Sequence, residues 1–335
     1  MKPVNLALQG GGAHGAYTWG VLDALLEDGR FQFEAVSGTS AGAMNAVNLA
    51  DGLRIGGREG ARKKLADFWQ GASLDGKLSE GERDVADLLL SYWGGLGRVT
   101  ANFYDTASHF VSPYDVNPLD LNPLRDVLAS QVDFEALRRS EGPKLFIAAT
   151  NVHTGKVRVF HRTELTLDMV MASACLTLMF KAVMIDDIPY WDGGYMGNPV
   201  LFPFFTETKT EDVVLIQINP ISRNETPKTI NEIMDRINEI TFNSALIQEI
   251  RAVDFVGRLM DQGRLQGTHY KKIRLHMIEA DEELIALGAD SKMNADFGFF
   301  QQLFAIGRRA GKAFIAKNYE HIGLKGTMAV KETLI

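Results

Sequence analysis

The sequence predicts an α/β protein built on a parallel β-sheet with right-handed crossovers. Two short β-like segments, residues 4–9 and 33–37, are each followed by a helical segment, residues 14–27 and 41–49. Strands and helices that alternate at this pace are typical of parallel sheets. A later segment, residues 212–218, is continuously apolar, as expected of a strand that is buried on both faces.

The N-terminal elements are marked by their side-chain patterns. The strand at residues 4–9 ends in a run of glycines. The helix at residues 14–27 has a broad apolar face, and the helix at residues 41–49 is rich in Ala, Met and Val, which indicates burial. Two more helical segments, residues 61–69 and 83–92, follow.

The middle of the chain, residues 57–142, is its least regular part, and residues 94–122 are rich in Gly, Pro, Asn and aromatic residues. Long irregular stretches are often lids or binding loops. Regular elements then return. We expect strands at residues 143–150, 156–161, 183–191 and 272–277, and helices at residues 165–173 and 294–319. Because no repeat or linker interrupts the chain, we expect a single domain over residues 1–335.

A long helix is expected after the strand at residues 212–218. Pro227 and a capping box formed by Thr229 and Glu232 mark its start. Apolar residues then recur at helical spacing. They are Ile230, Ile233, Met234, Ile237 and Ile240.

Composition restricts the classes of function. The chain has 335 residues, of which 46% are apolar, and a formal net charge of −7. The negative charge argues against a nucleic-acid partner, because binding to phosphates needs a basic face. No apolar stretch is long enough to span a bilayer, and no secretory signal is recognisable. Cys175 is the single cysteine, so an internal disulfide is excluded. We expect a cytoplasmic protein, with peripheral contact with a membrane left open.

The most informative motif is a Gly-x-Ser-x-Gly, formed by Gly38, Ser40 and Gly42. It follows a predicted strand and precedes a predicted helix, which is the setting of a nucleophile elbow. The positive end of that helix would favour negative charge at the reacting centre. The glycines that end the first strand offer backbone N–H groups for an oxyanion, with Gly11 and Gly12 as the candidate donors. Together these motifs predict an enzyme that attacks esters with a serine.

A serine nucleophile needs a base to take its proton. A catalytic triad would use a histidine late in the chain. The late histidines are His269, His276 and His321. His276 lies within a predicted strand and His321 beyond a long predicted helix, so neither stands where a strand leads into a loop. The alternative base is Asp192, which ends a β-like segment and precedes two glycines.

In their order along the chain, these motifs resemble those of the patatin-like phospholipases of bacterial type. The matching residues are Gly10-Gly11-Gly12-Ala13-His14-Gly15, Gly38-Thr39-Ser40-Ala41-Gly42 and Asp192-Gly193-Gly194. The resemblance covers about residues 4–205, and residues 206–335 carry no diagnostic motif. It implies a three-layer α/β/α fold with a mostly parallel central sheet. It also implies hydrolysis of lipid acyl esters, by a phospholipase A or lysophospholipase type of reaction.

The resemblance also assigns roles to residues. Ser40 would be the nucleophile and Asp192 the base of a catalytic dyad that forms an acyl-enzyme. The reaction requires no metal or organic cofactor, and its partner is a lipid ester at a membrane interface. The remaining roles are an oxyanion loop of Gly10, Gly11, Gly12 and Gly15, with support from Gly38, Gly42, Gly193, Gly194 and His14.

The chain departs from the family pattern in two places. His14 stands where the family often has Arg or Lys, so any charge that it lends to the site would depend on pH. Thr177 and Lys181 stand where prolines are usual, which affects the wall of the acyl pocket.

Other interpretations of the same motifs remain open at this point. The glycine loop also fits a dinucleotide fingerprint. That motif needs an acidic residue at the end of the second strand, whereas Glu34 lies at the start of that strand. Ser40 alone would suit a helix cap, and Asp192 alone a turn. An acyltransferase with the same dyad and a non-catalytic lipid-binding protein are the functional alternatives.

Overall fold

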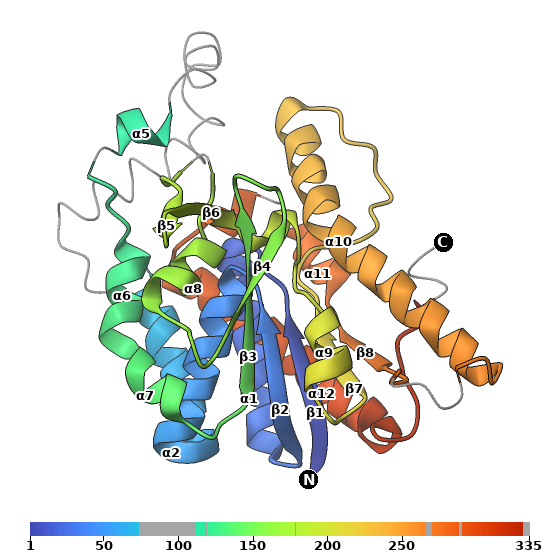
Figure 1. Ribbon diagram of the computed structural model, residues 1–335. Helices are drawn as coiled ribbons and strands as arrows, with labels where there is room; N and C mark the ends of the chain where they lie inside the picture. The colour runs from blue at the N-terminus through green and yellow to red at the C-terminus, as the bar shows by residue number, and fades with distance from the viewer. Residues whose placement is uncertain (74–111, 118, 178, 266–269, 288–289, 331–335) are drawn as a thin grey trace.

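The computed structural model describes residues 1–73, 112–117, 119–177, 179–265, 270–287 and 290–330 (Figure 1). Within these residues the chain forms one sheet of eight strands in the order β5-β6-β3-β2-β1-β7-β8, with β4 paired to β3. The strands are β1 (Lys2–Leu8), β2 (Phe31–Gly38), β3 (Lys144–Asn151), β4 (Val157–His161), β5 (Val183–Ile185), β6 (Ile188–Asp192), β7 (Asp212–Ile216) and β8 (Arg274–Ile278).

The centre of the sheet is parallel. β3, β2, β1, β7 and β8 all run in the same direction, whereas β4 and β6 run antiparallel to β3, and β5 antiparallel to β6. The C-terminal ends of the parallel strands therefore meet at one end of the molecule. In doubly wound α/β folds, ligands bind at this end of the sheet.

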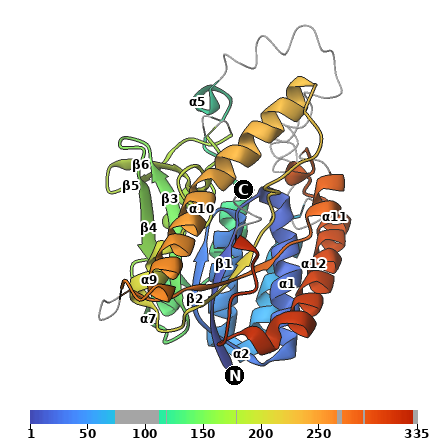
Figure 2. The ribbon, with the colours of Figure 1, turned by 90° about the vertical axis from the view of Figure 1, so that its right-hand side faces the viewer.

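Helices cover both faces of the sheet (Figures 1 and 2). α1, α2 and α12 lie on one face, and α9 and α10 lie on the other. The prediction of a three-layer α/β/α fold is thereby confirmed. The helices are α1 (Gly15–Asp28), α2 (Ala41–Gly71), α5 (Pro113–Val116), α6 (Pro123–Gln131), α7 (Phe134–Arg139), α8 (Leu167–Ser173), α9 (Phe202–Glu207), α10 (Ile230–Asp261), α11 (Asp281–Ala286) and α12 (Phe297–Asn318).

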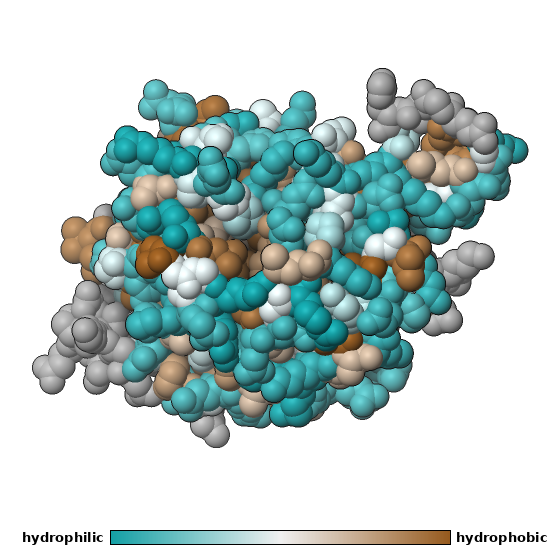
Figure 3. Space-filling model, turned by 90° about the horizontal axis from the view of Figure 1, so that it is seen from below, coloured by the Kyte–Doolittle hydropathy of each residue, from teal (hydrophilic) through white to brown (hydrophobic). Residues whose placement is uncertain are grey.

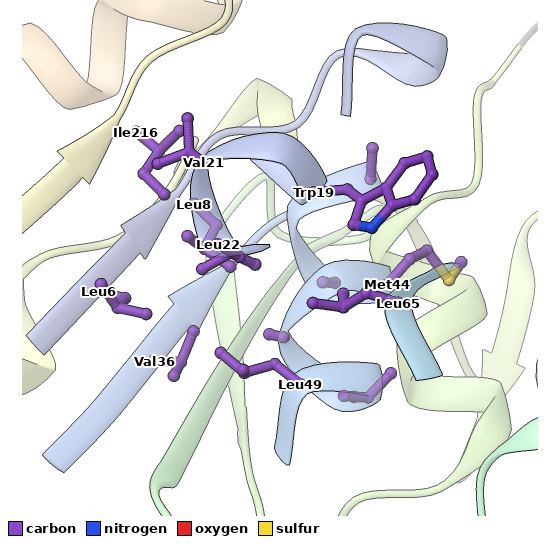
Figure 4. Close-up of a cluster of buried hydrophobic side chains, with 14 of the residues drawn as sticks. Leu6, Leu8, Trp19, Val21, Leu22, Val36, Met44, Leu49, Leu65 and Ile216 are labelled. Atoms are coloured by element: carbon purple, nitrogen blue, oxygen red, sulfur yellow. The ribbon is translucent and has the colours of Figure 1, made fainter. Parts of the chain in front are cut away.

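Alternation along the strands divides the apolar side chains between two cores. Leu6 and Leu8 enter the core beneath α1 and α2, whereas Ala7 belongs to the core beneath α9 and α10. Figure 4 shows how strand and helix side chains meet in the first core. The labelled residues are Leu6, Leu8, Trp19, Val21, Leu22, Val36, Met44, Leu49, Leu65 and Ile216. This packing holds the start of α2, and with it the predicted elbow, against the sheet.

Some expectations need correction. Residues 183–191 form a hairpin and not one strand, because Asp186 and Asp187 both take positive φ angles and reverse the chain between β5 and β6. α2 extends far beyond residue 49 and includes the helix expected at residues 61–69. Its backbone leaves helical geometry at Gly56 and Gly57. The helix expected at residues 83–92 lies outside the described residues, as does most of the segment at residues 94–122.

The capping box of α10 forms as predicted, since the Thr229 and Glu232 side chains each accept a hydrogen bond from the other residue's backbone N–H. The apolar residues that follow are not buried, however. They are between 41% and 69% exposed, and we call them the α10 apolar face: Ile230, Ile233, Met234, Ile237 and Ile240. The N-terminal half of α10 extends beyond the C-terminal ends of the parallel strands (Figures 1 and 2). In the described part of the chain, no helix is long and apolar enough to cross a membrane.

Candidate active site

Ser40 occupies the sharp turn between β2 and α2. Its backbone takes φ 54° and ψ −122°, a strained conformation for a residue with a side chain. α2 begins at the next residue, so the N-terminal end of its dipole lies at Ser40. The Ser40 N–H donates to Oγ of Ser173, which closes α8, at 2.9 Å. Gly42 is needed in this turn, because a Cβ there would overlap the carbonyl oxygen of Leu8.

Strand pairing explains why Asp192 lies near Ser40. Gly38, the last residue of β2, pairs with Ile147 of β3. Asp192, the last residue of β6, pairs with Ala149, two residues further along β3. β4 occupies the other edge of β3 at both positions, so β2 and β6 follow one another along the same edge. The ends of these two strands are thereby brought together.

The carboxyl of Asp192 is fully buried, and Ser40 is only 7% exposed. Burial raises the pKa of Asp192 to about 7, although a hydrogen bond from the Gly194 N–H and the nearby Ser40 hydroxyl both lower it. The Gly194 N–H donates to Oδ1 at 2.7 Å. Oδ2 has no hydrogen bond of standard geometry among the described residues. The structure therefore places a serine hydroxyl beside a carboxylate that keeps one acceptor oxygen available.

The glycine loop lies directly beside the nucleophile. A Cβ on Gly10 would be 2.7 Å from the Cβ of Ser40, so the two backbones are in close contact. Gly11 precedes a 3₁₀ turn, η1 (Gly12–His14), and Gly15 begins α1 in contact with Ala41. On the other side, Gly193 and Gly194 begin the turn η3 (Gly193–Tyr195) after Asp192. Gly10 and Gly15 thus lie against the turn that holds Ser40, and Gly193 and Gly194 follow Asp192 directly.

A cluster of buried side-chain amides holds this loop, and the sequence analysis missed it. The cluster consists of Gln9, Asn198, Asn219 and Asn243, and each of these residues is at most 2% exposed. The Gly10 N–H donates to Asn198 Oδ1 at 2.6 Å, and Asn219 Nδ2 donates to the Gly10 carbonyl at 2.7 Å. Gln9 Nε2 donates to Asn243 Oδ1 at 3.0 Å. One signal was available, because Asn219 directly follows the apolar strand at residues 212–218 and so falls at the same end of the sheet.

His14 is buried and bonded to the C-terminal part of the chain. Its Nε2 is 2.7 Å from Oγ of Ser291. Burial, with a smaller contribution from Lys292, lowers the pKa of His14 to about 3. The imidazole is therefore neutral near neutral pH. The pH-dependent charge that the sequence suggested at this position is not supported.

The structure does not place the late histidines that it describes beside Ser40. His276 is buried in β8 and bonds Asp212 Oδ1 at 2.9 Å and Thr327 Oγ1 at 3.0 Å. Asp212 is the first residue of β7, so this pair faces the end of the sheet where strands begin. His321 ends the turn η5 (Tyr319–His321), which follows α12. His269 lies outside the described residues.

Comparisons with known proteins agree with the motifs. The family model for patatin-like phospholipases matches residues 6–205. Among solved structures, VipD from Legionella pneumophila is similar with a TM-score of 0.36 and 15% identity, over 91% of this chain and 67% of that one. The complex of full-length SpcU with full-length ExoU, from the type III secretion system of Pseudomonas aeruginosa, contains a chain that matches with a TM-score of 0.29 and 17% identity. That match covers 99% of this chain and 66% of the other. The chain thus spans about two thirds of the length of these structures. No curated protein matches it.

Proposed function

Because the chain belongs to the patatin-like phospholipase family, we propose that it hydrolyses acyl esters of lipids with Ser40 as nucleophile and Asp192 as base. The observation that supports this most directly is the meeting of these two side chains beside the glycine loop. Residues from three separate segments of the chain converge there. A helix cap or an isolated turn would explain each residue alone but would not bring them together.

The proposed reaction follows from the positions of these groups. Asp192 takes the proton of the Ser40 hydroxyl as its oxygen attacks the ester carbonyl. The N–H groups of Gly11 and Gly12 stabilise the tetrahedral oxyanion. The protonated Asp192 then gives the proton to the departing alcohol, which leaves an acyl-enzyme. A water molecule, activated by Asp192, releases the fatty acid and restores the serine.

Burial gives Asp192 a suitable strength as a base. An aspartate with an ordinary pKa is a weak base, whereas a pKa of about 7 is matched to a proton transfer near neutral pH. The same burial removes water from the carboxylate, so its attraction for the serine proton is less screened. No metal or organic cofactor is needed in this reaction.

Replacement of Ser40 by alanine tests the proposal. We expect hydrolysis of a short p-nitrophenyl ester, and release of fatty acid from phospholipid, to fall by at least about 10³-fold in Ser40→Ala. An organophosphonate that reacts with activated serines should label the wild type stoichiometrically and leave Ser40→Ala unlabelled. Hydrolysis retained by Ser40→Ala would refute the dyad. A wild type that is neither labelled nor active would favour a non-catalytic lipid-binding protein, and products with the acyl group on a second alcohol would favour an acyltransferase.

We further propose that this protein meets its substrate at a lipid surface, through the α10 apolar face. Phe242, two residues beyond Ile240, packs its ring on Tyr195, three residues from Asp192, with the ring centres 5.6 Å apart. The exposed face is thus continuous with the candidate site. The opposite end of the molecule, seen from below in Figure 3, is mostly hydrophilic with scattered apolar residues. An apolar surface beside the candidate site suits a protein that approaches lipid from that side.

An aspartate in the α10 apolar face tests this contact. Ile237→Asp should reduce co-sedimentation with phosphatidylcholine vesicles, and hydrolysis of those vesicles, by about tenfold, because a charge there opposes burial in lipid. Hydrolysis of a soluble short ester should stay within twofold. Ile55→Asp is the matched control, since Ile55 is 59% exposed against 49% for Ile237 but lies far along α2 from Ser40. Equal vesicle binding by the two variants would contradict the proposal.

A further inference from the structure

We propose that Lys292 is a positioning residue that strengthens the oxyanion loop through Asn219. The inference rests on the proposed function, because it assumes that the glycine loop binds the oxyanion. Lys292 lies in the turn η4 (Asp290–Met293), far beyond the residues that the family model matches. It would bring a positive charge to a loop whose own histidine is neutral.

Lys292 is joined to the loop by a chain of two hydrogen bonds. Its Nζ donates to Asn219 Oδ1 at 2.9 Å. Asn219 Nδ2 donates in turn to the Gly10 carbonyl at 2.7 Å. The Asn219 backbone is held as well, because its N–H donates to Gln9 Oε1 at 3.0 Å. Because the oxygen and the nitrogen of its side-chain amide are both held, Asn219 is already oriented to pass the polarising effect of Lys292 to Gly10.

The geometry of the peptide bond carries the effect to the reacting centre. The Gly10 carbonyl and the Gly11 N–H belong to one planar trans peptide, so they point in opposite directions. Asn219 holds the carbonyl on one side of the loop. The Gly11 N–H, a proposed oxyanion donor, is therefore directed to the side away from Asn219.

The charge of Lys292 makes this chain stronger. A hydrogen bond from an ammonium group is charge-assisted, and it polarises the amide that accepts it. The polarised Asn219 amide is a better donor to Gly10, and the polarised peptide presents a better N–H donor at Gly11. An oxyanion that develops at this N–H is stabilised more than the neutral ester, so the effect belongs to the transition state.

The backbone of Lys292 contacts the same loop. A Cβ on Gly12 would overlap the Lys292 carbonyl oxygen, and Gly12 has a φ of 58°. The neighbouring residue, Ser291, bonds His14. Lys292 also lies near the buried carboxylate of Glu239, which is bonded to Arg223 and Arg236. Lys292 thus shares the neutralisation of that carboxylate with Arg223 and Arg236, and its charge lowers the pKa of Glu239.

The test compares Lys292→Met, Lys292→Gln and Lys292→Arg on a short soluble ester. We expect Lys292→Met to lower kcat by about tenfold with KM within twofold, less than the loss of a direct oxyanion donor. Lys292→Gln, which keeps a hydrogen-bond donor without the charge, should have a kcat between those of Lys292→Met and wild type. Lys292→Arg should keep at least about a third of kcat because it keeps the charge. Lys312→Met, which removes an exposed lysine from α12, is the matched control.

A second measurement separates this role from a merely structural one. A trifluoromethyl ketone forms an anionic tetrahedral adduct with an activated serine, so its affinity reports oxyanion binding. In Lys292→Met this affinity should fall by the same factor as kcat, while thermal unfolding shows that the variant is folded. Loss of kcat without loss of ketone affinity, or kcat within twofold of wild type, would overturn the inference. A wild type without ester hydrolysis or adduct would instead refute the proposed function.

Discussion

The residues proposed for the reaction and the residues that hold them come from different parts of the chain. Ser40 and Asp192 lie within the region that the family model matches, residues 6–205. Asn219, Asn243 and Lys292 lie beyond it. Asn219 donates to Gly10 of the glycine loop, Asn243 accepts from Gln9 beside it, and Lys292 donates to Asn219. The C-terminal part of the chain is thus required for the shape of the candidate site, although it contributes none of the proposed reacting atoms.

The two groups also differ in their physical state. Ser40 has a strained backbone, and Asp192 is a buried carboxylate with one oxygen that has no hydrogen bond of standard geometry among the described residues. By contrast, Asn243 satisfies both ends of its amide, since Nδ2 donates to the carbonyls of residues 219 and 220 and Oδ1 accepts from Gln9. Strain and unpaired charge lower stability, whereas a satisfied buried network raises it. The comparison teaches that reactivity and stability are assigned to separate residues.

The largest expected effect concerns the reactive group, and it appears as a pH dependence. Asp192 must be ionised to accept a proton, and its pKa is about 7. We therefore expect kcat/KM for a short ester to rise tenfold per pH unit below 7 and to level off above it. At pH 5 the value should be about 100-fold below the plateau, as measured in initial rates across this range.

Glu249 provides the control for this profile. Burial raises its pKa to about 7 as well, and its Oε2 accepts the N–H groups of Leu201 and Phe202 at the start of α9. Because Glu249 does not contact the proposed dyad, Glu249→Gln should leave the midpoint of the profile unchanged. If the midpoint near pH 7 disappeared in Glu249→Gln, the essential ionisation would belong to Glu249 and not to Asp192. The assignment of reactivity to Asp192 would then be contradicted.

The candidate reactive groups could be proposed from the sequence because their signals are local. A strand, a Gly-x-Ser-x-Gly and a helix that follow one another directly predict the elbow, and the structure has a strained turn at Ser40. The parallel α/β sheet was predictable from the alternation of strands and helices, and the three-layer arrangement from the resemblance to the patatin-like phospholipases. The roles of Ser40 and Asp192 stay predictions, although the structure places the two side chains together.

The supporting residues could not be predicted, because their partners are far away in the sequence. Asn219 meets Gly10 across 209 residues, and nothing in its neighbourhood distinguishes it from a turn asparagine. The exposure of the α10 apolar face could not be predicted for another reason. Its spacing correctly indicates a helix, but periodicity alone does not say whether the apolar face meets a core or the surface.

The smaller expected effects are in stability, and they should have opposite signs in the two groups. Asn243→Leu removes the Asn243 partner of Gln9 Nε2, which keeps its bond to the Asn198 carbonyl, and the Asn243 donor to the buried carbonyls of residues 219 and 220. We expect this change to lower the free energy of unfolding by about 2–4 kcal/mol at any pH between 5 and 8, measured by urea denaturation. A variant as stable as wild type would show that the amide cluster is not what holds the loop.

Asp192→Asn should have the reverse effect. The pKa of Asp192 rises from 3.8 to about 7 on folding, so the folded state binds the proton more tightly than the unfolded state. Stability therefore falls as the pH rises from about 4 to 7, and the loss is complete above 7. Removing the carboxylate abolishes this loss, so at pH 8 Asp192→Asn should be more stable than wild type by about 1–4 kcal/mol while being inactive. At pH 4 the gain should largely vanish. An inactive variant whose gain in stability over wild type is no larger at pH 8 than at pH 4 would mean that the carboxylate does not destabilise the fold. The contrast between reactive and supporting residues would then be lost.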